Sequence, residues 1–151
     1  MKICLIASSG GHFEQIMMLR PLIEEYSGFI VTEKTNYDLS LNFANFYYLK
    51  QVNRNEIKFL WRMLLNFFKS LEIFLKEKPD VVISTGALAT IPMCFLAKLF
   101  KRKLAFIESF AKVNSPTLTG KIMYKIADEF YVQWEEMLNI YPNAIYKGGV
   151  Y

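Results

Sequence analysis

The sequence predicts an α/β protein built on a doubly wound parallel sheet, and three observations lead to this prediction. Short apolar runs typical of buried strands alternate with longer segments of helical periodicity along the 151 residues. Seven such runs occur, and this alternation favours a parallel sheet covered by helices on both faces. Hydrophobic residues make up 53% of the chain, and no linker or internal repeat interrupts it. We therefore expect a single domain over residues 1–151 with its own core.

The first half of the chain contains three expected strands, each of them short and apolar: residues 2–7, 29–32 and 46–49. Helical spacing runs through residues 13–26, although Pro21 should bend or interrupt that helix. A long helix is expected over residues 56–78, because Pro79 cannot continue it.

The second half continues the alternation. Strands are expected at residues 81–84, 104–107, 130–132 and 144–146, and helices at 88–100, about 119–127 and about 134–140. Cys4 and Cys94 each lie inside an apolar run, without a paired cysteine motif or a nearby histidine. This pattern predicts two buried thiols in a reducing compartment and no metal site. The N-terminus becomes glycine-rich too early for a signal peptide, so we expect a cytoplasmic protein.

The charge is concentrated in one segment. Residues 50–78 hold three acidic side chains and seven basic ones, which account for the net charge of +4: Lys50, Arg54, Lys58, Arg62, Lys69, Lys76 and Lys78. A second basic group, Lys98 with residues 101–103, closes another apolar stretch. Basic charge beside apolar surface indicates an anionic partner, either a lipid surface or nucleic acid.

The helix at 56–78 is strongly amphipathic. Thirteen of the nineteen residues from Ile57 to Leu75 are apolar, while the polar ones share an arc of about 160°. Its charges argue against a membrane span, and the segment 88–100 is too short for one. A helix lying on a membrane surface fits this composition, and packing against the sheet is the alternative. The membrane-associating candidates are Lys58, Trp61, Arg62, Phe67, Phe68 and Lys69.

The loop after the first expected strand reads Ser8-Ser9-Gly10-Gly11-His12. Two glycines permit close approach of a ligand to the backbone, and free N–H groups at a helix start attract anions such as phosphate. His12 is the only histidine in the chain, and imidazole is the group best suited to exchange a proton near neutral pH. The alternative is an ordinary turn in which the histidine only caps the helix.

Two further loops follow strands that should end at the same edge of the sheet. Thr85-Gly86 opens a helix and, beside the first loop, is expected to share an anion site, although alone it reads as an ordinary turn. Glu108 directly follows an apolar strand. Its carboxylate is expected either to accept a hydrogen bond from a sugar or nucleotide hydroxyl, or only to cap backbone groups.

These motifs, in this order, resemble the N-terminal half of MurG-like glycosyltransferases of the GT-B architecture. The family's Gly-Gly-His loop is matched by residues 8–12, and its Pro-Asp-Val-Val segment by residues 79–82, followed by Gly86 and Pro92. Its glutamate after the next strand is matched by Glu108, and its closing glycine linker by residues 147–150. The resemblance implies a Rossmann-like, N-terminal-type GT-B domain, without the second domain that binds the nucleotide-sugar.

A chain with only this half resembles the PssD/CpsF-like subunits of split glycosyltransferases in capsule and exopolysaccharide synthesis. These are relatives of the membrane-anchoring subunit of the eukaryotic dolichol-linked GlcNAc transferase. The resemblance implies a heterodimer whose partner binds the UDP-sugar donor, with no permanently bound cofactor and a lipid-linked saccharide as acceptor. Because the N-terminal membrane span of the eukaryotic relatives is absent from this sequence, peripheral anchoring at the cytoplasmic membrane face is expected to fall to the 57–75 helix.

On this reading, His12 is the candidate catalytic base, and Glu108 would orient His12 or an acceptor hydroxyl. Ser8, Ser9, Gly10, Gly11, Thr85 and Gly86 are the candidate acceptor and phosphate ligands. Two alternatives remain. One is a nonenzymatic membrane scaffold that activates a partner; the other is a free-standing nucleotide-binding domain whose basic segment binds nucleic acid. Nucleic-acid binding should fall steeply with salt.

Overall fold

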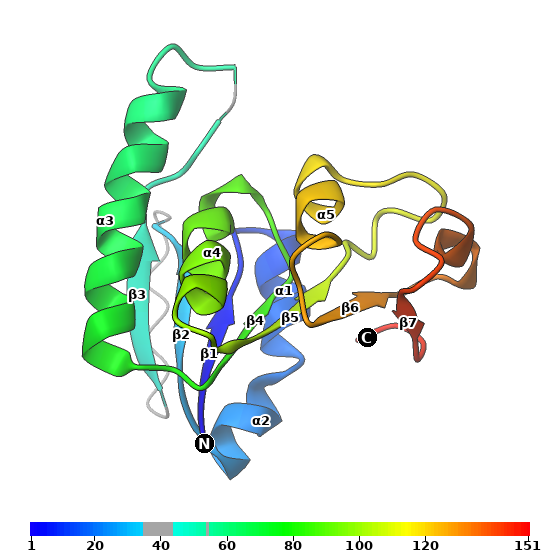
Figure 1. Ribbon diagram of the computed structural model, residues 1–151, viewed down its shortest axis with the longest axis horizontal. Helices are drawn as coiled ribbons and strands as arrows, with labels where there is room; N and C mark the ends of the chain where they lie inside the picture. Colours follow the sequence, from blue (N-terminus) through cyan, green and yellow to red (C-terminus); the bar gives the residue numbers. More distant parts are fainter. Residues whose placement is uncertain (35–43, 54) are drawn as a thin grey trace.

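A computed structural model describes residues 1–34, 44–53 and 55–151. Its seven strands are all parallel and form one sheet in the order β3-β2-β1-β4-β5-β6-β7 (Figure 1). The strands are β1 Lys2–Ile6, β2 Ser27–Glu33, β3 Asn45–Leu49, β4 Val81–Ser84, β5 Lys103–Ile107, β6 Glu129–Val132 and β7 Ile145–Tyr146. The predicted Rossmann-like sheet is confirmed, and each expected strand lies within two residues of its observed bounds.

The helices depart more from the prediction. The described residues form α1 Gly11–Met17, α2 Arg20–Glu25, α3 Phe59–Glu77, η1 Leu88–Thr90, α4 Ile91–Leu99, α5 Leu118–Met123 and η2 Glu135–Asn139. The segment 13–26 is split as expected, with Pro21 in the first turn of α2, where its missing N–H costs nothing. The segments 88–90 and 135–139, which lie within helices predicted without a helix type, are 3-10 helices. Near Pro79, Lys78 ends α3 in a left-handed conformation.

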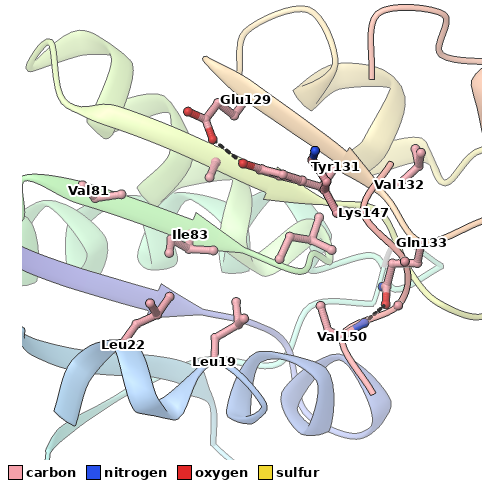
Figure 2. A pocket seen from close by; sticks show the side chains of 14 residues that line it. Leu19, Leu22, Val81, Ile83, Glu129, Tyr131, Val132, Gln133, Lys147 and Val150 are labelled. Atoms are coloured by element: carbon pink, nitrogen blue, oxygen red, sulfur yellow. Dashed lines mark hydrogen bonds between the residues drawn. The ribbon is translucent and has the colours of Figure 1, made fainter. Parts of the chain in front are cut away.

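Two apolar clusters lie on opposite faces of the sheet. The larger cluster joins α3, α4 and α5 to the sheet and includes both cysteines, as predicted. Burial raises the pKa of the Cys94 thiol to about 12, so this group stays protonated. The smaller cluster packs α1 and α2 on β1 and β2. Helices therefore pack on both faces, as expected, and on the second face a hollow of about 370 Å³ lies over β4–β6 beside Leu19 and Leu22 (Figure 2).

Helix α3 stands along the β3 edge of the sheet (Figure 1), and its buried side carries polar residues as well as the core residues Ile73 and Phe74. Asn66 and Ser70 are 1% and 0% exposed, whereas Leu60, Phe68 and Leu75 are more than half exposed. The Ser70 hydroxyl has no hydrogen-bond partner among the described residues, which is a cost of this orientation. The exposed apolar residues form a continuous ridge along the helix: Leu60, Trp61, Leu64, Phe67, Phe68 and Leu75.

Asn66 holds α3 in this orientation. Its Oδ1 accepts a hydrogen bond from the backbone N–H of Lys50 at 2.9 Å, and its Nδ2 donates to the Lys50 carbonyl at 2.8 Å. A second anchor is the buried Glu77, which contacts the Lys2 ammonium and the Tyr47 hydroxyl. Burial alone would raise the pKa of Glu77, but these two hydrogen bonds outweigh it and lower the pKa.

Replacing Asn66 should therefore destabilise the fold. In Asn66→Leu, the N–H and C=O of Lys50 both lose their partner, and we expect the free energy of unfolding to fall by about 2–4 kcal/mol. The matched variant Leu75→Gln changes an exposed position of the same helix and should stay within about 0.5 kcal/mol of the parent. Urea denaturation measures both changes. A neutral Asn66→Leu together with a costly Leu75→Gln would mean that α3 presents its other side to the sheet.

Candidate active site

The candidate site lies at the topological switch point of the sheet. Strand β1 pairs with β2 on one side and with β4 on the other. From β1 the strand order runs outward to β3 on the first side and to β7 on the second. In open parallel sheets, ligands bind at the carboxyl ends of the two strands that flank this point. The loops that follow β1 and β4 are Ala7–Gly10 and Thr85–Ala87. The two loops that the sequence singled out therefore meet in space.

His12 is fixed by the loop after β4. Its Nδ1 lies 2.6 Å from the Thr85 carbonyl oxygen, and the Thr85 hydroxyl donates to the His12 carbonyl at 2.8 Å. Because a carbonyl oxygen only accepts, Nδ1 carries the hydrogen, which leaves Nε2 as the unprotonated nitrogen of the neutral ring. Gly86 has φ +93°, and a Cβ there would lie 3.4 Å from His12 Cε1, so the ring rests closely against this turn.

Some hydrogen-bond donors of the first loop are bonded within the protein, and others are free to bind a ligand. Ser8 N–H donates to the Gly86 carbonyl at 2.9 Å, and Ser9 donates through both N–H and Oγ to Glu33 Oε2. The backbone N–H groups of Gly10 and Gly11 have no hydrogen-bond partner among the described residues, and a Cβ at either position would meet open space. Of the predicted first-loop ligands, these two glycines have donors left for a ligand.

The donors of the second loop are used within the fold. Thr85 N–H donates to the Ile6 carbonyl, and Gly86 N–H donates to Ser84 Oγ at 3.1 Å. Both residues are buried. The expectation that the backbone of Thr85 and Gly86 holds an acceptor phosphate is therefore corrected: in this structure the pair positions His12.

Glu108 is 1% exposed and does not contact His12. Its carboxylate accepts hydrogen bonds from Ser109 N–H at 2.9 Å, from Thr117 N–H at 3.2 Å and Oγ1 at 2.8 Å, and from Tyr141 Oη at 3.1 Å. Burial and this carboxylate raise the pKa of Tyr141 well above its usual value, so the phenol stays a donor. The expected contact between Glu108 and His12 is thus not formed, and the carboxylate closes the 108–117 loop.

Gly120 shows how tightly Glu108 is enclosed. A Cβ at this position would lie 1.9 Å from Glu108 Oε2 and 2.9 Å from Thr117 Oγ1, so only glycine leaves room for the carboxylate. Thr117 also caps α5, because its Oγ1 accepts from Gly120 N–H at 2.8 Å. The glutamate therefore joins the end of β5 to the start of α5.

Three buried polar residues that sequence reasoning missed support these loops. Glu33, at the end of β2, binds Ser9 and also accepts from Val52 N–H at 3.1 Å through Oε1. Gln133 Nε2 donates to Gln15 Oε1 at 2.9 Å and to the Glu108 carbonyl at 2.8 Å. Glu33 and Gln133 each stand at the carboxyl end of an apolar strand, as Glu108 does, and that shared position was the signal available in the sequence.

The predicted membrane-associating residues all lie on or beside α3. Trp61 and Phe68 are about 60% exposed, Phe67 is 37% exposed, and Lys58 lies at the start of the helix. Arg62 pairs with Glu56 at 2.9 Å and Lys69 with Glu72 at 3.0 Å. Arg54, counted with the basic segment, lies outside the described residues. In the second basic group, Lys98 pairs with Asp128 and Arg102 with Asp80, which reduces its net charge.

The described residues contain neither a membrane-spanning helix nor a metal-binding cluster. None of their helices is long and apolar enough to cross a membrane. Within the same ranges, no three His, Cys, Asp or Glu side chains gather in a way that could hold a metal ion.

A protein-family model described as "Oligosaccharide biosynthesis protein Alg14 like" matches residues 28–150. The chain belongs to this Alg14-like family. Among curated Alg14-like proteins, the UDP-N-acetylglucosamine transferase subunit ALG14 of Homo sapiens is 26% identical, over 99% of this chain and 83% of that protein. The rat subunit of the same name is 28% identical, over 97% of this chain and 81% of the relative.

Solved structures show where the Alg14-like fold recurs. Acinetobacter baumannii MurG matches with a TM-score of 0.67 and 14% identity, over 87% of this chain and 40% of MurG. UDP-N-acetylglucosamine 2-epimerase from Rickettsia bellii matches with a TM-score of 0.73 and 16% identity, over 99% of this chain and 45% of the epimerase. This chain thus spans less than half of either structure, and at such identities the likeness establishes the fold alone.

Proposed function

We propose that this chain is the acceptor-side subunit of a two-subunit glycosyltransferase that transfers a sugar from a UDP-sugar to a lipid-linked saccharide. The observation that carries the proposal is His12, whose Nδ1 is engaged by the Thr85 carbonyl while Nε2 is left as a base at the switch point. The names of the relatives, which describe subunits of a UDP-N-acetylglucosamine transferase, support both the reaction class and a separate partner. They also make UDP-N-acetylglucosamine the first donor to test.

In the proposed reaction, an acceptor hydroxyl lies beside His12 Nε2 and attacks the anomeric carbon of the donor sugar. The new C–O bond forms as the bond from that carbon to the diphosphate oxygen breaks, and UDP departs with the electron pair. His12 takes the hydroxyl proton on Nε2, and the Thr85 carbonyl stabilises the imidazolium through Nδ1–H. The free N–H groups of Gly10 and Gly11 are available to orient the acceptor saccharide.

The buried Glu108 has a positioning role in this proposal. By binding Ser109 and Thr117, it sets the course of the loop that follows β5 at the same edge of the sheet as His12. The donor is bound mainly by the partner subunit, and no permanently bound cofactor is involved. From the sequence resemblance, we propose that the reaction belongs to capsule or exopolysaccharide synthesis and that the acceptor saccharide is linked to undecaprenyl diphosphate.

We further propose that the exposed ridge of α3 seats the complex on the cytoplasmic face of an anionic membrane. An outward row of Trp, Phe and Leu beside basic residues has the composition of helices that lie in the membrane interface. Further exposed apolar side chains on α4 and directly after it, at Phe95, Leu99 and Phe100, support this proposal. A nucleic-acid duplex would contact the basic residues through its phosphates and would leave this apolar ridge in water.

Removing the proposed base should abolish transfer. In a complex with the donor-binding subunit, His12→Ala should lower the rate of sugar transfer to lipid-linked acceptor by at least about 100-fold. Glu14→Ala, an exposed change on the same helix, is the matched control and should transfer normally. Copurification of the two subunits and vesicle binding should be unchanged in both variants. Near-normal turnover of His12→Ala would remove His12 from the mechanism and favour the scaffold alternative.

Replacing apolar side chains of the ridge by polar ones should release the protein from membranes. In Phe67→Ser/Phe68→Ser, lost apolar contact should lower partitioning onto anionic vesicles by at least about tenfold, with the thermal unfolding midpoint nearly unchanged. Cosedimentation measures the partitioning. Val113→Ser/Leu118→Ser removes two exposed apolar side chains elsewhere and should bind as the parent does. If the ridge variant instead unfolds, the two phenylalanines belong to the core, and the proposal that the ridge binds the membrane is wrong.

A further inference from the structure

A groove between α3 and the edge strand β3 lies outside the site built around His12. Its first part is a hollow of about 540 Å³ with four basic side chains and one tryptophan in its wall: Lys34, Lys50, Gln51, Lys58, Trp61, Arg62 and Leu65. Lys34 and Lys50 directly follow β2 and β3, so the hollow opens at the carboxyl edge of the sheet. The fold has thus gathered basic side chains from two strand ends and the start of a helix.

The second part of the groove is mainly apolar. A hollow of about 450 Å³ continues along α3, with Tyr48, Leu49, Leu65 and Phe68 in its wall. Lys34, Lys50 and Leu65 line both hollows, so the two form one continuous groove. The groove therefore has a basic end and an apolar end.

The basic end keeps a positive charge. Arg62 is paired with Glu56, but Lys34, Lys50 and Lys58 are exposed and have no ion pair with any described residue. In the apolar part, Lys69 and Glu72 are the two charged residues that it does not share with the basic end, and they pair with each other at 3.0 Å. A cluster of three lysines that have no acidic partner among the described residues favours a phosphate or diphosphate over a neutral ligand.

We infer that this groove binds the head of the lipid-linked acceptor, with its diphosphate at Lys34, Lys50 and Lys58 and the first part of its hydrocarbon chain along Leu65 and Phe68. The inference rests on the proposed function and names where that substrate is held. A nucleotide or free sugar phosphate would leave the apolar part empty, whereas a lipid carrying a diphosphate matches both ends. Trp61 and Phe68 belong both to the groove and to the exposed ridge, so a chain can pass from the membrane into the groove.

The position of the groove suits the reaction at His12. Successive strands lie roughly 5 Å apart, and Lys34 and Lys50 follow the strands one and two places from β1. The loop that carries His12 follows β1 itself. A diphosphate at the lysines therefore leaves the saccharide to extend along the edge of the sheet toward His12.

Binding of a soluble lipid diphosphate tests the inference without partner or donor. The probe is farnesyl diphosphate, titrated into the full chain carrying Trp134→Phe, so that Trp61 in the groove wall is the only tryptophan reporting by fluorescence. Calorimetric titration of the unchanged chain measures the same Kd independently of that substitution. Lys34→Gln/Lys50→Gln should raise the Kd at least tenfold. The control Lys121→Gln/Lys125→Gln removes two exposed lysines near α5 and should bind as the parent does.

Three further ligands decide which part of the probe is recognised. Inorganic pyrophosphate and farnesol should each bind at least tenfold more weakly than farnesyl diphosphate, because each lacks one half of the ligand. Dihexanoyl phosphatidylglycerol should also bind more weakly; equal affinity would assign the groove to a bilayer phospholipid and overturn the inference. Equal binding by the lysine variant and its control would overturn it as well. Because no transfer is measured, groove binding can fail while His12-dependent transfer stands, or stand while transfer fails.

Discussion

The orientation of α3 is the constraint on which the rest of this structure depends, and the Asn66 side chain imposes it. Its amide satisfies both backbone groups of Lys50, and this fixes the helix so that Asn66 and Ser70 face the protein together with Ile73 and Phe74. The apolar residues of the ridge are consequently outside, although burial of apolar surface is the main driving force of folding. That arrangement is stable when another apolar phase covers the ridge, and a membrane interface provides one. The same two hydrogen bonds place Lys50 in the wall of the basic groove.

The sheet could be predicted from the sequence because each strand is a short apolar run bounded by turn residues. The side of α3 that faces the sheet could not be predicted, since a wide apolar stripe has the same sequence pattern whether it packs on a sheet or on a lipid surface. Only a tertiary contact decides between them, the one between Asn66 and Lys50, which lies sixteen residues earlier and directly after β3. The 3-10 geometry at residues 88–90 could not be predicted for a similar reason, because the spacing of apolar residues does not distinguish a 3-10 helix from an α-helix.

The candidate site shows the same division between local and tertiary information. The glycines and His12 could be identified from the sequence because a glycine-rich turn after a strand is a local pattern. The hydrogen-bond donors that remain free for a ligand could not be identified, because the N–H groups of Ser9 and Thr85 have partners on strands distant in the sequence. Glu108 was noticed for its place at a strand end, but its enclosure by Thr117, Gly120 and Tyr141 depends on elements that follow it in the chain. The site is therefore a histidine held by backbone, supported by buried polar residues.

The central claim is that the outward ridge of α3 lies in the membrane interface, and the depth of Trp61 tests it most directly. Anionic vesicles containing brominated lipid should quench the Trp61 fluorescence of the bound Trp134→Phe chain strongly, because this side chain stands on the ridge. If another surface of the protein binds the vesicle, Trp61 stays away from the acyl chains, and vesicle-bound protein with unquenched Trp61 fluorescence would contradict the account.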